Sequence, residues 1–391
     1  MGLLSLDRRV RVVVAANFLV VAARMGVVTF LGIYFVRVAG IDLALVGAAF
    51  LLENALRGAA APFFGALSDR VGRRSLLVAA AAFSAIALPC FLLVTGPASL
   101  FAWSASIGLA GAVNMPVAAA LLLDLAPAER RQSVLALNYT VMSVAYTVAV
   151  IPAGYVAERS YAVLALLSAL GYVLVAVLYL AALRTPVPAE HVTREGMLRD
   201  TVSAFGDRTF LLFAACAVIF PLSMGLVVIA SPLFGADLGL GEGYIGLVLG
   251  GNSLIVAALA VPVATRIEPS GPFWLLGAAS LVLAGAFTCY ALVPHPAAAL
   301  LVGTVVFSFA ELVFSSAVPA AVARLAPVGR RGAYQGGWAL VGSLAMGSAL
   351  VLSSTLRGPY GWQGAWLMYA ALALVAAVAL YGLRGRLLER V

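Results

Sequence analysis

Charged residues are scarce in this chain of 391 residues. Asp, Glu, Lys and Arg together make up 10% of it, whereas a soluble globular domain carries about 25%. Lysine is absent, so all 24 basic residues are arginine. Hydrophobic residues make up 64% of the chain, and the mean hydropathy is +1.08. This composition excludes an ordinary soluble domain.

Cysteine and histidine are also scarce. Cys90, Cys216 and Cys289 lie inside apolar runs and far apart in sequence, which is typical of small buried side chains and not of a disulfide or metal site. His191 and His295 lie in the gaps between runs. The chain has no Gly-rich ATP-binding loop and no metalloprotease His pair. We therefore expect no enzyme, no metal and no cofactor.

Long apolar runs take the place of charge. Residues 75–95 and 273–293 contain no charged side chain. At about 1.5 Å per residue, runs of this length cross a hydrocarbon layer of roughly 30 Å. The pattern predicts an all-α membrane protein with twelve transmembrane helices, arranged as two pseudo-symmetric six-helix bundles. The predicted spans are 12–36, 44–65, 75–95, 98–123, 132–156, 161–183, 209–233, 243–265, 272–293, 297–323, 332–356 and 362–383.

The arginines predict the orientation of these helices. With the N-terminus inside, 19 arginines fall on one face, three on the other and two within spans. Positive residues favour the cytoplasmic side, so both termini are expected in the cytoplasm. The same placement explains the formal charge of +8 without nucleic acid. The first apolar run has no cleavage site of the signal-peptide type, so we expect a true first helix.

The longest polar stretch divides the chain. We expect an N-terminal six-helix bundle over residues 1–183, a cytoplasmic linker over 184–208 and a C-terminal six-helix bundle over 209–391. Two halves with an internal linker are typical of secondary transporters, whose halves rock around a site at the membrane midplane. A monomer is expected.

A motif follows the second predicted span. It reads Gly65-Ala-Leu-Ser-Asp69-Arg70-Val-Gly72-Arg73-Arg74. Gly65 would let helices approach, Gly72 would permit a tight turn, and Asp69 could pair with an arginine. The segment resembles the signature of the major facilitator superfamily. The resemblance implies a charged latch on the cytoplasmic side that holds the two halves together in the outward-open state.

The fourth predicted span strengthens this resemblance. Residues 114–124, ending at Asp124, are similar to the fourth span of multidrug exporters in the superfamily, and Asp124 is a plausible partner for the latch arginines. The drug:proton antiporter branch often has an arginine in the fourth span and a longer glycine–proline element in the fifth. Here the fourth span has no arginine, and only residues 151–154 remain of the other element.

Ionisable side chains lie deep in three spans. Arg24, Glu53 and Glu311 are each about 12 residues, or roughly 18 Å, from the predicted cytoplasmic end. Arg57 follows Glu53 by one helical turn and shares its face. Such side chains are costly in lipid and are expected to face a cavity or one another. Arg24, Glu53 and Arg57 could form a structural ion cluster, or Glu53 could accept a proton. Glu311 has no partner in its own helix, which makes it the better proton carrier, although it could also contact a cationic substrate.

Polar and aromatic residues in the spans are candidates for a substrate-binding wall, because aromatic faces accommodate lipophilic cations. The candidates, together with the arginines, are Asn17, Arg24, Tyr34, Arg57, Asn138, Tyr139, Tyr146, Asn252, Phe314 and Trp338.

The leading hypothesis is a proton-coupled secondary exporter of small amphipathic or cationic compounds in a prokaryotic inner membrane. Glu311 and Glu53 would carry the proton in an alternating-access cycle. Two alternatives remain open. One is uptake or exchange of a polar or anionic metabolite bound by Arg24 and Arg57, and the other is flipping of a lipid or lipid-linked sugar.

Overall fold

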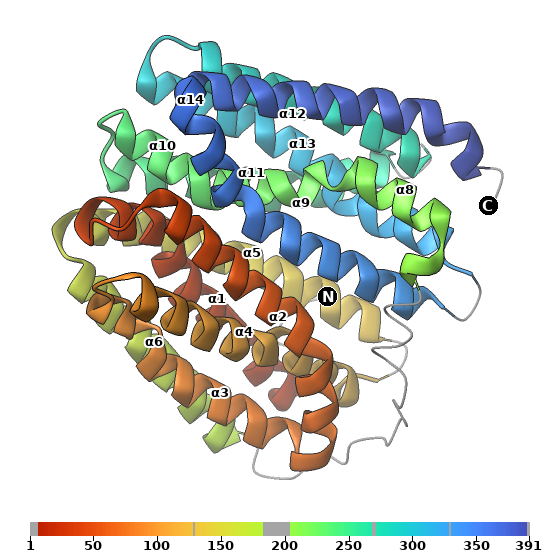
Figure 1. Cartoon of the computed structure of the whole chain (residues 1–391). Coiled ribbons are helices and arrows are strands. Elements are labelled where there is room, and N and C mark those ends of the chain that lie inside the picture. The colour runs from red at the N-terminus through yellow and green to blue at the C-terminus, as the bar shows by residue number, and fades with distance from the viewer. Residues whose placement is uncertain (1–6, 128–129, 183–203, 268–270, 328–329, 389–391) are drawn as a thin grey trace. The chain divides into compact units, whose positions relative to one another are not determined.

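The computed structural model describes residues 7–127, 130–182, 204–267, 271–327 and 330–388. The predicted linker therefore lies mostly outside the described residues. Within the described ranges the regular structure is entirely helical, as Figure 1 shows. This confirms the all-α fold expected from the apolar runs.

The first half contains six membrane-length helices. Two of them end in a turn of different pitch: a π-helical turn, Tyr34–Val38, extends α1, and a 3₁₀ turn, Pro89–Leu93, extends α3. The helices are α1 (Arg8–Ile33), α2 (Leu43–Val71), α3 (Arg73–Ala87), α4 (Pro97–Leu125), α5 (Arg131–Arg159) and α6 (Tyr161–Ala182).

The second half begins with an interrupted crossing. A short 3₁₀ turn, Ala204–Gly206, leads into it, and a π-helical turn, Leu226–Ala230, lies in its middle. The first crossing of the first half, α1, also has a π-helical turn. The first crossing of each half therefore departs from a regular α-helix. The segments of this crossing are α8 (Arg208–Ala217), α9 (Ile219–Gly225) and α10 (Ser231–Asp237).

The remaining helices are α11 (Glu242–Ile267), α12 (Pro272–Leu292), α13 (Pro296–Leu325) and α14 (Arg331–Leu388). At 58 residues, α14 is far too long for one crossing of a bilayer about 30 Å thick. Gly361 has non-helical backbone angles within it (φ 66°, ψ 180°) and joins two crossings end to end. Counted in this way, the described residues contain the twelve predicted transmembrane helices.

Side-chain caps fix where several helices begin. Asp7, Asp42 and Asp207 precede α1, α2 and α8, and each carboxylate accepts a hydrogen bond from a backbone N–H in the first turn, at 2.7–2.9 Å. These donors have no partner within their own helix. Proline begins α4, α12 and α13, where a backbone N–H would have no partner within the helix and its absence costs nothing.

The chain forms two compact units. Unit 1 comprises Met1–Glu195 with Gly241–Gly250, and unit 2 comprises Gly196–Leu240 with Gly251–Val391. The start of α11 thus belongs to unit 1 and its remainder to unit 2. In unit 1, α1 packs against both α5 and α6, and α2 packs along α4. In unit 2, α12 packs against α13 and α14.

Candidate functional site

Three charged side chains meet in the interior of unit 1. Nη2 of Arg24 on α1 and Nη2 of Arg57 on α2 both donate to Oε1 of Glu53 on α2. Glu53 is 1% exposed. Arg57 lies one helical turn after Glu53, the spacing that brings two side chains to the same helix face. The ion cluster considered at the sequence level is therefore present.

Close helix contacts surround this cluster. A Cβ added to Gly108 on α4 would lie 2.6 Å from the carbonyl oxygen of Glu53, and one added to Gly111 would lie 2.9 Å from Nε of Arg57. The absence of side chains at these glycines lets α4 approach α2 at the level of the cluster. Buried Tyr172 of α6, a helix that packs against α1, lies close to Arg24.

The cluster is not internally balanced. Two arginines share one carboxylate, which leaves one positive charge in excess. Both arginines bond to the same oxygen of Glu53, and its other oxygen, Oε2, is buried without a hydrogen-bond partner among the described residues. Removing one arginine from the cluster would balance its charge, whereas removing Glu53 would increase the positive excess. The two removals should therefore affect stability unequally.

Two of the predicted polar candidates meet elsewhere in unit 1. Nδ2 of Asn17 on α1 donates to Oδ1 of Asn138 on α5 at 2.8 Å, and both side chains are buried. Asn138 also donates to Sδ of Met142 at 3.3 Å. This pair links the helices on which it lies, and among the described residues it forms no hydrogen bond with the arginine cluster.

Tyr34 lies in an aromatic group at the end of α1. Its ring centroid is 4.9 Å from Phe91 and 4.9 Å from Tyr161. Two other candidates on α5 differ in exposure, since Tyr139 is 59% exposed and Tyr146 is half-buried.

In unit 2, Glu311 on α13 lies in a cluster with neutral polar side chains. Nδ2 of Asn252 on α11 donates to Oε2 of Glu311 at 3.1 Å, and Oγ of Ser308 donates to Oδ1 of Asn252 at 2.6 Å. Ser308 is also 3.0 Å from the carbonyl oxygen of Thr304, one turn earlier. Glu311 and Asn252 are each 9% exposed. Within the described part of the chain, Glu311 forms no ion pair.

The two aromatic candidates of unit 2 pack close to this half's first crossing. Phe314 lies 5.0 Å from Phe220 between ring centroids and is one turn from Glu311 on α13. Trp338 on α14 lies 5.7 Å from Phe213. Of these two, only Phe314 shares the level of the Glu311 cluster along its own helix.

The motif between α2 and α3 is held within unit 1. Gly72 ends α2 with φ 89°, a left-handed conformation that favours glycine, and so forms the tight turn that the sequence predicts. Arg73 bridges Asp69 at 3.4 Å and Asp124, at the end of α4, at 2.5 Å. Arg74 donates to the carbonyl oxygens of two residues at the end of α6.

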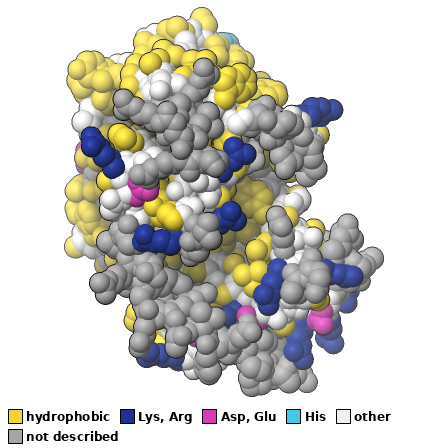
Figure 2. All heavy atoms as spheres, turned by 90° about the vertical axis from the view of Figure 1, so that its right-hand side faces the viewer, with side chains coloured by type: hydrophobic (Ala, Val, Ile, Leu, Met, Phe, Trp, Pro, Cys, Tyr) yellow, Lys and Arg dark blue, Asp and Glu magenta, His cyan; other side chains and the backbone are white. Residues whose placement is uncertain are grey.

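Two other residues of the motif, Arg70 and Gly65, are less enclosed than Arg73 and Arg74. Arg70 is exposed, and arginine side chains like it are spread over the face of the molecule shown in Figure 2. A Cβ added to Gly65 would meet no described atom within 4 Å. Gly65 therefore makes no close helix contact among the described residues of unit 1, and its role in helix approach stays a prediction.

Sequence reasoning missed two residues that lie beside the charged side chains. Ser308 donates to Asn252, which in turn donates to Glu311. Ser308 precedes Glu311 by three residues and so shares its helix face, a signal that the sequence carried. Tyr172 lies on α6, and no sequence pattern connects it with Arg24 on α1, because the contact depends on how these two helices pack.

The chain belongs to the major facilitator superfamily, whose family model matches residues 13–220 and 213–390. It is accordingly a secondary transporter with two repeated halves. A curated relative, the "Na(+), Li(+), K(+)/H(+) antiporter" of Planococcus maritimus, is 26% identical over 362 residues, which cover 84% of each chain.

Solved structures share the fold. A POT family transporter in complex with 5-aminolevulinic acid has a TM-score of 0.82 at 15% identity, covering 99% of this chain and 100% of that one. The nucleoside transporter NupG has a TM-score of 0.82 at 14% identity, covering 96% and 99%. The human organic anion transporter MFSD10 has a TM-score of 0.66 at 19% identity, covering 95% and 99%. These similarities concern the fold, and they span transporters of different substrates.

Proposed function

We propose that this chain is a proton-coupled exporter of small amphipathic or cationic compounds, and that Glu311 takes up a proton and the cation in turn. The observation that carries the proposal is the surrounding of Glu311. This buried carboxylate accepts one hydrogen bond from neutral Asn252 and forms no ion pair among the described residues. An unpaired negative charge is costly inside a membrane, so the carboxylate requires a proton or another cation as its partner.

Glu53 is a weaker candidate for this role. Both Arg24 and Arg57 already neutralise it, and the cluster as a whole carries a positive charge. A proton bound to Glu53 would increase that excess, whereas a proton bound to Glu311 removes a charge. The charge balance of the two clusters thus supports proton exchange at Glu311 and a structural or anion-facing role for Glu53.

The proposed cycle follows from competition for one carboxylate. On the cytoplasmic side, Glu311 loses its proton and binds the cationic substrate. On the outer side, a proton replaces the substrate, and the protonated carrier returns. Because one carboxylate cannot hold both partners, each turnover exchanges one for the other. The proposal places the chain in a prokaryotic inner membrane as a monomer with both termini in the cytoplasm.

Monovalent metal cations are a second candidate for the cargo. The curated relative is named for exchange of Na⁺, Li⁺ and K⁺ against protons. The Glu311 cluster also offers carboxylate, amide and hydroxyl oxygens from Glu311, Asn252 and Ser308, and hard cations prefer oxygen ligands. Multidrug and metal-cation exchange would use the same carboxylate and differ in what binds beside it.

Proton release on binding tests the proposal. Purified protein in weakly buffered detergent solution, with a pH indicator, would receive tetraphenylphosphonium, NaCl, LiCl or KCl in separate titrations. We expect at least one cation to release protons from the wild-type protein and none to release them from Glu311→Gln. The matched control is Glu158→Gln, which alters a carboxylate elsewhere. Undiminished release from a folded Glu311→Gln variant would refute the role of Glu311.

The same titrations separate the remaining alternatives. Binding of organic anions, lost in Arg57→Gln and unaffected by Glu311→Gln, would favour the anionic-metabolite hypothesis. Movement of a fluorescent lipid between leaflets of proteoliposomes would favour a flippase. The charge excess around Arg24 and Arg57 is the observation that keeps the anionic hypothesis open.

A further inference from the structure

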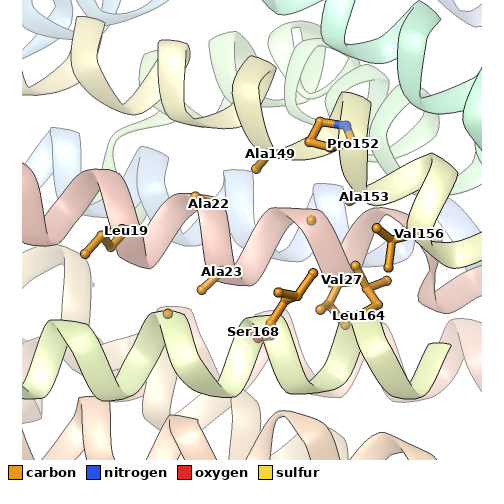
Figure 3. Close-up of a pocket in the computed structure, with 13 residues that line it drawn as sticks. Leu19, Ala22, Ala23, Val27, Ala149, Pro152, Ala153, Val156, Leu164 and Ser168 are labelled. Atoms are coloured by element: carbon orange, nitrogen blue, oxygen red, sulfur yellow. The ribbon is translucent and has the colours of Figure 1, made fainter. Parts of the chain in front are cut away.

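A narrow apolar groove lies between three helices of unit 1. Its volume is about 240 Å³, and residues of α1, α5 and α6 line it. Ala23 of α1 lies between the other two helices, with Ala149 and Ala153 on α5 and Ser168 on α6, as Figure 3 shows. Most lining side chains are small, so the space arises from missing side-chain volume between well-packed helices.

The groove reaches the surface of the unit. α1 packs extensively against both α5 and α6, while α5 and α6 touch each other little. Pro152 and Leu167 line the groove and are themselves exposed. The neighbouring exposed residues of α6, Val163 and Leu166, are apolar. The opening therefore lies on an apolar face of a membrane-spanning unit, which lipophilic molecules reach from the bilayer.

One polar group interrupts this apolar lining. Ser168 is 2% exposed and lines the groove, and its Oγ has no hydrogen-bond partner among the described residues. A serine inside a helix commonly donates to the carbonyl oxygen four residues earlier, as Ser280 does to Leu276 at 2.9 Å. A buried hydroxyl without a partner is unfavourable, and a ligand in the groove can supply the partner.

We propose that this groove binds a small lipophilic molecule that carries one hydroxyl or carbonyl group, and that Ser168 holds that group. The volume supports a small ligand, since sites for drug-sized molecules measure about 300–1,000 Å³. Along α1 the lining runs from Leu19 to Val27, about 12 Å at 1.5 Å per residue. A linear or flat molecule with a single polar group fits this length and this lining.

The site adjoins the buried ion cluster. A Cβ added to Gly171, which lines the groove, would lie 2.8 Å from Cβ of Ala23. The next residue on α6 is Tyr172 and the next on α1 is Arg24, and these two side chains lie close to each other. A ligand in the groove therefore lies against the helix contact that presents Arg24 to Glu53, and its binding is expected to stabilise that contact.

Photolabelling tests the site without reference to transport. Wild-type protein in proteoliposomes would be irradiated with a diazirine-bearing octanol, in competition with plain octanol, and the labelled residues mapped by mass spectrometry. We expect labels on the lining residues of α1, α5 and α6. Ala149→Phe, which fills the groove, should lose this label. Ser168→Ala should weaken competition by octanol about threefold to tenfold, the effect of one hydrogen bond.

The control variant is Ala162→Phe, which adds the same bulk to an exposed position of α6 outside the lining and should leave labelling unchanged. Labels scattered over the whole apolar surface, unaffected by Ala149→Phe, would overturn the site. A different result would be equal labelling of wild type and Ser168→Ala, together with a diazirine-bearing alkane that competes as well as the alkanol. It would identify a lipid acyl chain as the occupant and overturn the role of Ser168. Glu311→Gln should label normally, so this result is independent of the proposed exchange.

Discussion

Asn252 on α11 donates to Glu311 on α13 at 3.1 Å, and both side chains are buried. Asn252 follows the boundary at which α11 passes from unit 1, which contains Gly241–Gly250, to unit 2. The hydrogen bond therefore connects the proposed proton carrier with the helix that both units share. Protonation of Glu311 changes the acceptor of this hydrogen bond from a charged carboxylate to a neutral carboxylic acid. The strength of the bond between α13 and α11 therefore depends on the proton.

The first prediction concerns this hydrogen bond. Asn252→Ala removes a donor to a charged acceptor, a bond that contributes about 1.5–3 kcal/mol. We expect cation-dependent proton release to require roughly tenfold or more higher cation concentration, because each 1.4 kcal/mol corresponds to about a tenfold change. The titration used for Glu311→Gln measures this effect.

Ser280→Ala is the control for this variant. Ser280 is also buried in unit 2, but it bonds only to a carbonyl oxygen of its own helix. If both variants shifted the titration equally, the effect would be a general loss of packing and not a property of the Glu311 cluster.

The second prediction uses the charge excess in unit 1. Glu53→Gln would leave Arg24 and Arg57 buried without a carboxylate, and loss of one partner of a buried pair costs about 3–5 kcal/mol. Arg57→Gln would leave Arg24 and Glu53 as a balanced pair and should be tolerated better. Thermal unfolding in detergent should therefore rank the proteins as wild type and Arg57→Gln above Glu53→Gln. A Glu53→Gln protein as stable as Arg57→Gln would contradict the structural role of the cluster.

The third prediction concerns the motif between α2 and α3. Arg73 approaches Asp124 to 2.5 Å and Asp69 only to 3.4 Å. Asp124→Asn should therefore reduce the transport rate more than Asp69→Asn, with little loss of folded protein. Exchange of the two charges, Arg73→Asp with Asp124→Arg, should restore part of the rate lost in Asp124→Asn. Transport rates in proteoliposomes measure these effects. A larger loss of rate in Asp69→Asn than in Asp124→Asn, or no recovery in the exchanged pair, would contradict the prediction.

The fourth prediction concerns the contact between α2 and α4. A methyl group at Gly108 would lie 2.6 Å from the carbonyl oxygen of Glu53, whereas one at Gly251 would meet no described atom within 4 Å. Gly108→Ala should lower the unfolding temperature and Gly251→Ala should not, because overpacking typically costs about 1–3 kcal/mol. Equal unfolding temperatures for the two variants would show that α2 and α4 separate easily.

Much of the fold could be predicted from the apolar runs. Their length and number gave twelve crossings, because a helix must satisfy its own backbone hydrogen bonds in lipid. The interruptions within helices were less visible. Nothing in the run around Tyr34 distinguishes its π-helical turn from regular helix, and the kink at Gly361 falls between two spans predicted as separate.

The candidate site was predictable only along each helix. The spacing of Glu53 and Arg57 by four residues indicated a shared face, and the same rule would have placed Ser308 on the helix face of Glu311. Partners on different helices, such as Asn252 for Glu311 or Tyr172 for Arg24, depend on helix packing, which a single sequence does not reveal.

Flux in proteoliposomes under an imposed pH gradient tests the central claim most directly. Each protein would be reconstituted at equal density, and proton movement would be followed by an internal pH dye after addition of the cation that releases protons in detergent. We expect wild-type and Glu158→Gln proteins to exchange protons for that cation, and folded Glu311→Gln protein to show no flux above empty liposomes. Cation-driven proton flux at the wild-type rate through Glu311→Gln would contradict the account.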